Sequence, residues 1–206
     1  SFRCLSQVHG VATDALERAI AACELELNAA AENPLVMTDD REMLSSGNFH
    51  LGALSLTGDT LAMALAQVAA MQVGRIVKLM QAELTQLPRY LTPVGGASAG
   101  FVPTQKTAVA LYGEVRRHAN PAGLDQFAVS ETVEDHSPQT PLVYDKLEDQ
   151  LSALERLIAL EMLVAAQAVD LRKPARLGAS SATLHATIRG AVPALSEDRE
   201  NGPDIE

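Results

Sequence analysis

The stretch from Leu51 to Gln86 constrains the fold of this chain more than any other segment. Its apolar residues fall on nearly every side of a helix, and Gln67 and Gln72 interrupt the most apolar run, residues 60–74. A helix without a polar face must be covered by other protein on every side. A chain of 206 residues can hardly supply that cover alone. We therefore expect a buried helix that packs against partner subunits.

A membrane-spanning helix is the other interpretation of such a run. A span needs about 20 mostly apolar residues, whereas Asp59, Arg75 and Lys78 closely flank this one. We therefore predict a buried helix and no membrane partner. The formal net charge of −10 also argues against nucleic acid or an anionic membrane surface as a partner, because Lys and Arg are needed to neutralise phosphates.

The rest of the chain is also predicted to be helical, so the fold class is all-α with long antiparallel helices. Aromatic residues make up only 3% of the composition, and the core must therefore be aliphatic. Residues 35–48 are expected to form a loop, and no run alternates as a strand would. The tail 196–206 is expected to be solvated and mobile. Helices are predicted from residue 13 to the Asn33-Pro34 pair and over residues 104–117, 141–172 and 183–191.

The first predicted helix has a start signal and an apolar face. Thr13 or Asp14 is a suitable N-cap, because a short oxygen-bearing side chain can accept a free backbone N–H. Leu16, Ile20 and Leu27 then recur at helical spacing. These residues lie on one face of the predicted helix.

A glycine-rich string, GGASAGF at 95–101, contains the G-x-S-x-G pattern of a serine hydrolase nucleophile elbow around Ser98. Such an elbow needs a buried strand before it and a helix directly after it. The preceding residues are few and include Pro93, and the rest of the chain supplies no parallel sheet. A plain turn is therefore favoured over a nucleophile.

Glu134, Asp135 and His136 form the second candidate for chemistry, in a predicted loop over 120–139. Two carboxylates beside an imidazole can act as general acid or base. A solvated acidic turn is the alternative, and the residues alone favour it. The histidines show no metal-ligand spacing. His9 and His50 are expected to be hydrogen-bonded interior residues.

Two features bear on the setting of the chain. Two cysteines are too few for a disulfide framework, and we therefore expect a reducing, cytoplasmic environment. The sequence begins SFRC without an initiating methionine, which indicates a fragment.

Seven strings, in order along the chain, resemble the aromatic amino acid lyase family, in particular its histidine ammonia-lyase branch. Each string alone is weak evidence, but together they extend over essentially the whole chain and need few gaps. They are SFRCLSQVHG at 1–10, ELNAAAENPLV, SSGNFH at 45–50, TQLPRYL, GGASAGFVPTQKT, VEDH at 133–136 and AAQAVDLR.

The resemblance implies an all-helical homotetramer that eliminates ammonia from an aromatic amino acid, with L-histidine to urocanate as the favoured reaction. It also implies a methylidene-imidazolone electrophile, formed from an internal Ala-Ser-Gly, that takes up the amine lone pair. That tripeptide does not occur in this chain. We therefore expect residues 1–206 to be the C-terminal helical domain of an amino acid ammonia-lyase, inactive without its N-terminal part.

Three site residues follow from the resemblance. Arg3 matches an arginine that binds the substrate carboxylate, Phe101 a phenylalanine packed near the electrophile, and Glu134 the glutamate that meets the substrate side chain or amine. The string before Glu134 departs from the family, with Thr132-Val133 in place of Asn-Gln. This departure leaves a related aromatic amino acid lyase or an aminomutase as an alternative. A helical oligomerisation domain without enzymatic activity is another, and a hydrolase that uses Ser98 is the third.

Overall fold

The computed structural model describes residues 3–125, 127–174 and 176–206. The chain forms two compact units, each built from separate stretches of sequence. Unit 1 comprises Ser1–Cys4, Ala69–Val115 and Leu151–Glu206, and unit 2 comprises Leu5–Val68 and Arg116–Gln150. Three helices, α2, α4 and α5, contribute residues to both units, and each unit is described by itself below.

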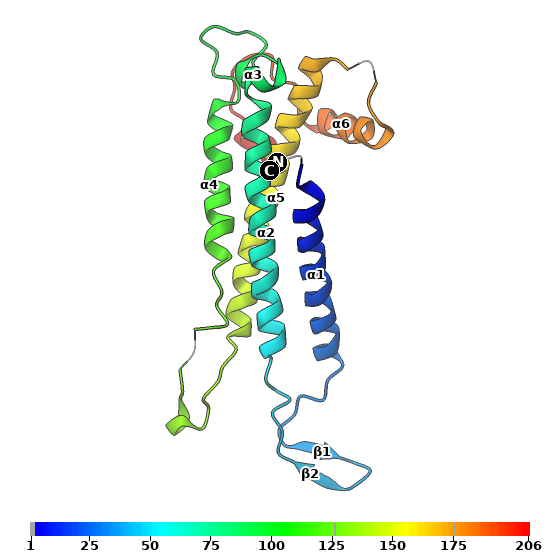
Figure 1. Ribbon diagram of the computed structural model, residues 1–206, viewed down its shortest axis with the longest axis vertical. Helices are drawn as coiled ribbons and strands as arrows, with labels where there is room; N and C mark the ends of the chain where they lie inside the picture. The colour runs from blue at the N-terminus through cyan, green and yellow to red at the C-terminus, as the bar shows by residue number, and fades with distance from the viewer. Residues whose placement is uncertain (1–2, 126, 175) are drawn as a thin grey trace. The chain divides into compact units, whose positions relative to one another are not determined.

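Helices dominate both units, and the predicted all-α class is confirmed (Figure 1). Residues 35–48, which we predicted to be a loop, contain a two-stranded antiparallel hairpin in which Leu35 pairs with Leu44. Each strand has three residues, too few for an alternating pattern to be recognised. The elements in chain order are α1 (Leu5–Leu27), β1 (Leu35–Met37), β2 (Glu42–Leu44), α2 (Gly52–Leu79), α3 (Ala82–Thr85), η1 (Arg89–Leu91), α4 (Val102–His118), η2 (Ser130–Thr132), α5 (Thr140–Arg172), α6 (Ala179–Ala191) and η3 (Gly202–Ile205).

In unit 2, α1 packs on the first part of α2 and of α5 through small residues. Ala15 and Ala19 are each 5% exposed and lie in one cluster with residues of α2 and with Leu147 of α5. Gly58 allows equally close packing of α2 and α5, since a Cβ atom there would lie 2.7 Å from Cγ1 of Val143. Small side chains on α1 and α2 let the helix backbones approach one another closely.

The predicted N-cap of α1 was wrong. The helix begins at Leu5, so Thr13 lies inside it, and its hydroxyl donates to the carbonyl of His9 at 3.0 Å instead of capping. The apolar face found from the periodicity is exposed, with Leu16 and Ile20 at 47% and 49%. Periodicity identified a helix face correctly, but the neighbouring alanine face is the one that packs.

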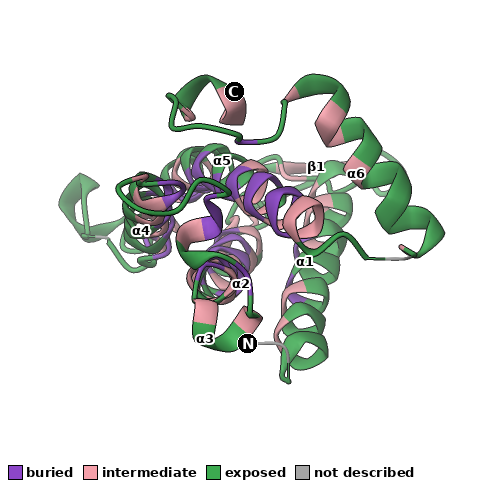
Figure 2. Ribbon diagram, turned by 90° about the horizontal axis from the view of Figure 1, so that it is seen from above, coloured by how far each residue is buried: buried purple, intermediate pink, exposed green. Residues whose placement is uncertain are grey.

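In unit 1, the second parts of α2 and α5 pack with α4 around an aliphatic core. Ile76, Leu157 and Val164 are fully buried there, and Phe101 is 1% exposed. Figure 2 shows buried residues concentrated on α2 and α5, whereas α6 carries exposed and intermediate residues. The predicted helix 104–117 is α4, with Pro103 in its first turn, where a missing N–H costs least.

The apolar helix α2 is long and apolar enough to cross a bilayer by length and composition, with a mean hydropathy of 1.4 over its most apolar window. Half of that window is buried inside the protein. Two of its polar residues, Asp59 and Gln72, are each 5% exposed. This burial is consistent with the core-helix interpretation, while Leu56 remains 66% exposed and is not covered by this chain.

The tail that was predicted to be mobile, residues 196–206, is bound to the rest of the chain at Asp198, which accepts from Ser98 Oγ at 2.6 Å, and Leu195 just before it is bound as well. Gln167 on α5 is 2% exposed, and its amide accepts from Leu195 N at 2.9 Å and donates to Leu195 O at 2.9 Å. Farther along, Arg199 and Asp204 form an ion pair at 2.6 Å. The polar composition of this segment hid these bonds, because a single buried amide on a distant helix supplies those at Leu195.

Candidate active site

The candidate active site is a cleft of about 790 Å³ in unit 2, where the segment before α2 meets the loop between α4 and α5. These two stretches are far apart in sequence, yet both flank helices of the same small bundle. Residues that line the cleft are Asn33, Gly47, Phe49, His50, Phe127, Val129, Val133, Glu134, Asp135, His136, Ser137 and Pro138.

Glu134 ends a short, tight backbone turn. Val129 N donates to Glu134 O at 2.8 Å, and Glu134 N donates to Val129 O at 3.3 Å, so the two residues form an isolated antiparallel bridge. Between them, Ser130, Glu131 and Thr132 all have positive φ, at 53°, 56° and 74°. Non-glycine residues with positive φ are strained, and such strain is concentrated at functional sites.

Three hydrogen bonds tie the loop that carries Glu134 to the start of α2. The His50 and His136 rings are joined at 2.7 Å, between Nε2 and Nδ1. Ser55 Oγ donates to Pro138 O at 2.5 Å, and Thr140 Oγ1 donates to Leu51 O at 3.3 Å. These bonds hold the loop beside residues 47–52.

His50 was expected in the interior, but it lies exposed beside His136. Both rings are exposed at the cleft, with centroids 4.8 Å apart and planes at 50°. His9, also expected in the interior, is exposed on α1. The prediction of hydrogen bonding is confirmed for His50, whereas the prediction of burial is wrong for both. His50 and His136 are 86 residues apart, so no local sequence pattern could have predicted that their rings pair.

The charge of the cleft suits a cationic or polar ligand. Its lining residues include the carboxylates of Glu134 and Asp135, two histidines and the rings of Phe49 and Phe127, but no Lys or Arg. A carboxylate attracts an ammonium group, and an aromatic ring can pack against the apolar part of a ligand. A ligand carboxylate would need a cation from outside these lining residues.

The structure places the three predicted site residues in different surroundings. Glu134 lines the cleft in unit 2. Arg3 belongs to unit 1, where it is exposed and makes no ion pair with the described residues. Phe101, also in unit 1, is 1% exposed and its backbone N donates to Tyr90 O at 3.0 Å. Its side chain is part of the core of unit 1, and its role in substrate binding stays a prediction.

Sequence reasoning missed Phe49, which lines the same cleft as Glu134 and is 55% exposed. It lies in the string SSGNFH, which carried part of the resemblance, so a signal for this position was available. Phe127 is 89% exposed and had no comparable signal.

The glycine-rich loop 95–101 is a turn that binds a carboxylate of its own chain. Asp198 accepts from Ser98 Oγ at 2.6 Å, from Ala99 N at 2.7 Å and from Gly100 N at 2.9 Å. The hydrogen bond from Ser98, followed by those from the two backbone N–H groups, lowers the pKa of Asp198 below its ordinary value. The element directly before this loop is the short helix η1, and within the described residues no strand leads into Ser98, as the plain-turn interpretation predicted.

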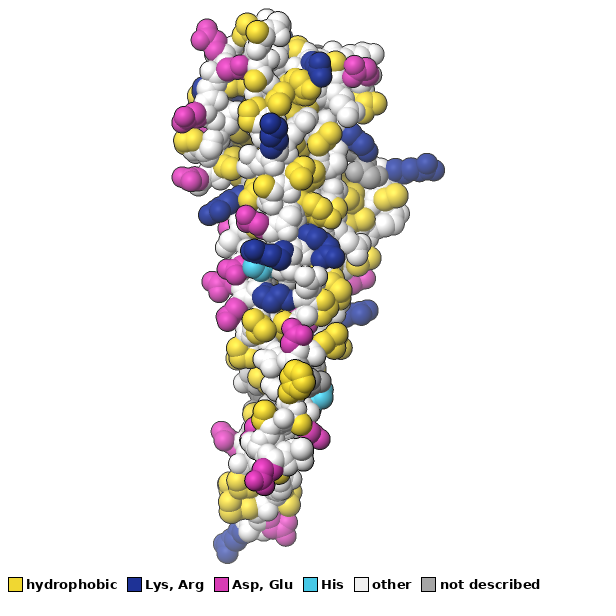
Figure 3. Space-filling view, turned by 90° about the vertical axis from the view of Figure 1, so that its left-hand side faces the viewer, with side chains coloured by type: hydrophobic (Ala, Val, Ile, Leu, Met, Phe, Trp, Pro, Cys, Tyr) yellow, Lys and Arg dark blue, Asp and Glu magenta, His cyan; other side chains and the backbone are white. Residues whose placement is uncertain are grey.

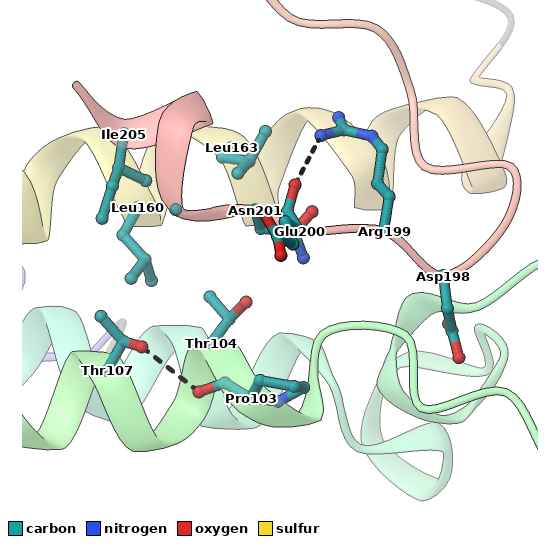
Figure 4. A pocket seen from close by; sticks show the side chains of 11 residues that line it. Pro103, Thr104, Thr107, Leu160, Leu163, Asp198, Arg199, Glu200, Asn201 and Ile205 are labelled. Carbon is teal, nitrogen blue, oxygen red and sulfur yellow. Dashed lines mark hydrogen bonds between the residues drawn. The ribbon is translucent and has the colours of Figure 1, made fainter.

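A second cavity of about 460 Å³ lies in unit 1 between α4, α5 and the C-terminal segment (Figure 4). Figure 4 shows apolar side chains such as Leu160 and Ile205 on its walls. Asp198 stands at one end and turns toward the loop before α4. Asp198, Arg199 and Glu200 are among the residues that line this cavity, and none of its lining residues is a histidine.

A family model described as aromatic amino acid lyase matches residues 1–190. The chain belongs to the aromatic amino acid lyase family. This confirms the family inferred from the seven strings, and it agrees with the helical fold described above.

Relatives of this aromatic amino acid lyase chain extend over its full length. The histidine ammonia-lyase of Symbiobacterium thermophilum is 38% identical over 206 residues, which are 100% of this chain and 41% of that protein. The chain therefore spans less than half of the relatives that it matches.

Solved structures agree closely with the fold. Ergothionase of Treponema denticola, an ergothioneine-degrading enzyme, has a TM-score of 0.94 at 32% identity and covers 99% of this chain and 41% of its own. Histidine ammonia-lyase of Trypanosoma cruzi has a TM-score of 0.94 at 33% identity, covering 98% of this chain and 40% of its own. Neighbours with different named activities share this fold, so the fold alone does not identify the substrate.

Proposed function

We propose that this chain is part of an ammonia-lyase that eliminates ammonia from an aromatic amino acid, with L-histidine as the favoured substrate and urocanate as the product. The observation that carries the proposal is the cleft of unit 2, in which Glu134 and Asp135 lie beside two histidines and Phe49. The match to histidine ammonia-lyases over the whole chain supports the same reaction.

Within this proposal, Glu134 binds the amine or the side chain of the substrate. Its carboxylate is exposed in the cleft, so it can accept a hydrogen bond from an ammonium or an imidazole N–H. Arg3 is proposed to bind the substrate carboxylate, because a guanidinium forms paired hydrogen bonds with that group. Phe101 is proposed to pack near the electrophile.

The electrophile must come from residues other than these, because the chain contains no Ala-Ser-Gly. In the family, the methylidene-imidazolone takes up the amine lone pair and makes nitrogen a better leaving group. The residues of the cleft fit a substrate amine or ring, and none of them forms that group. We therefore assign the chain substrate binding and proton transfer, and propose that the complete protein supplies the electrophile.

The proposal also includes a homotetramer in the cytoplasm. Apolar side chains are unpartnered on several helices, among them Leu25 at 67% and Leu27 at 84% on α1 and Leu56 at 66% on α2. On the face drawn in Figure 3, apolar side chains lie exposed among acidic and basic ones. A second copy of the chain would remove such residues from water. Light scattering of the complete protein tests the assembly.

The test of the proposed reaction is Glu134→Gln in the complete protein, with urocanate formation followed by its ultraviolet absorbance. We expect turnover to fall at least about 100-fold, as is typical when an acid–base or charge-binding group is removed. Glu131→Gln is the matched control, because Glu131 lies in the same turn but does not line the cleft. Unchanged turnover in Glu134→Gln would favour the oligomerisation domain instead.

A further inference from the structure

The two histidines of the cleft form a directed hydrogen-bond chain. Gly52 N–H donates to Nδ1 of His50 at 3.2 Å, so this ring nitrogen must be an acceptor without a proton. A neutral imidazole then carries its proton on Nε2. Nε2 of His50 lies 2.7 Å from Nδ1 of His136 and donates to it.

The same logic determines the tautomer of His136. Because its Nδ1 accepts from His50, the proton of the neutral ring lies on Nε2. Within the described residues, Nε2 of His136 has no hydrogen-bond partner, and the ring lines the cleft beside Glu134 and Asp135. The Nε2–H group of His136 is therefore a free donor in the cleft that Glu134 and Asp135 also line.

We propose that His50 is a positioning residue that holds His136 as an Nε2–H donor toward the ligand of the cleft. This rests on the proposed function for the identity of the ligand, but the tautomer itself does not. The acceptor that suits this donor is uncharged, such as an unprotonated ring nitrogen, because Glu134 and Asp135 repel a carboxylate. Glu134 accepts and His136 donates, so the two groups together match a ligand ring with one N–H and one bare nitrogen.

Position in the chain supports the assignment. His50 lies two residues before the start of α2, and His136 lies two residues before Pro138, whose carbonyl accepts from Ser55. Two neighbouring hydrogen bonds, from Ser55 to Pro138 and from Thr140 to Leu51, also hold the loop and involve neither histidine. The histidine pair is thus not the sole anchor of the loop, and its specific contribution is the orientation and tautomer of the His136 ring.

Ring ¹⁵N NMR of the complete protein with labelled histidine, at pH 8, tests the tautomers. We expect His50 and His136 each to show a protonated Nε2 and a bare Nδ1. In His50→Leu, His136 should become a mixture of both tautomers, whereas His50→Gln should retain the Nε2–H form, because the Gln amide can donate from the same place. His9→Gln is the control, since His9 is exposed on α1 away from the cleft lining. An unchanged His136 tautomer in His50→Leu would overturn the proposal.

Kinetics of the complete protein provide the second readout. We expect His50→Leu to lower kcat/KM about tenfold, as losses of orienting partners do at comparable sites, and His50→Gln to restore most of it. Circular dichroism on each variant confirms that the fold is retained. Equal kcat/KM in His50→Leu and the His9→Gln control would overturn a positioning role. If Glu134→Gln leaves turnover intact while the tautomers are as expected, the proposed reaction fails and the assignment of His50 stands.

Discussion

Asp59 provides the sharpest test of how unit 2 holds the segment that leads to the cleft. This carboxylate, 5% exposed on α2, accepts from Ala122 N at 3.1 Å and from Gly123 N at 2.9 Å. Both N–H groups lie at the beginning of the loop between α4 and α5, and Ala122 is 2% exposed. Replacing Asp59 by Ala would leave the buried N–H of Ala122 and the partly buried N–H of Gly123 without this acceptor.

The magnitude follows from those two bonds. A hydrogen bond to a charged group contributes about 1.5–3 kcal/mol, and an unpaired buried donor costs a similar amount. We expect Asp59→Ala to lower the free energy of unfolding by about 3–4 kcal/mol. Asp59→Asn keeps one acceptor oxygen, and we expect about half that loss. For a chain of this length, 3 kcal/mol corresponds to a fall in Tm of about 10 °C.

Urea unfolding measures the loss, and hydrogen exchange locates it. With an m-value of about 3 kcal/mol/M, Asp59→Ala should lower the urea midpoint by about 1 M. The amides of Ala122 and Gly123 should lose protection first. Asp149→Ala, at an exposed position on α5, is the matched control. A loss below about 1 kcal/mol, with both amides still protected, would refute the reasoning.

Three further predictions concern single positions. Gly100→Ala should strongly destabilise unit 1, because φ is +52° there and a Cβ would lie 2.6 Å from Tyr90 O; the melting temperature checks this. The lowered pKa of Asp198 predicts that its contribution to stability is present above its ordinary pKa of 3.8 and is lost as pH falls through the lower folded value. Asp198→Asn should remove that part of the acid dependence in urea titrations at several pH values. Burial raises the pKa of Tyr144 to about 12 from 10.0, so stability should be full below pH 10 and decline between pH 10 and 12. Tyr144→Phe should abolish the decline and remove the last phenolate to appear in an ultraviolet titration.

Much of the helical framework could be predicted from local pattern. The apolar run after Leu51 became α2, and the periodic residues 141–172 became α5 with its start one residue earlier. Periodicity did not decide which face of α1 packs, because Ala15 and Ala19 approach the neighbouring helices more closely than Leu16 can. A three-residue strand such as β1 carries too few alternations to be recognised.

The residues of the candidate site were also predicted only in part from the sequence. Glu134 was found from its acidic string and its resemblance, and the structure places it in the cleft of unit 2. Phe101 was predicted from a glycine-rich string, yet its ring lies in the core of unit 1. No local pattern predicted the bond between His50 and His136, which are 86 residues apart.

The sequence by itself therefore determined that the chain is helical, that α2 is a core helix and that the family is that of the aromatic amino acid lyases. Composition, periodicity and short strings depend only on residues that are close together in the sequence. The tertiary structure alone decided that Asp59 holds the loop at Ala122, that Asp198 holds the glycine-rich turn and that two histidines meet beside Glu134. Each of these contacts joins residues whose separation along the chain carries no signal, because helix packing sets which loops meet.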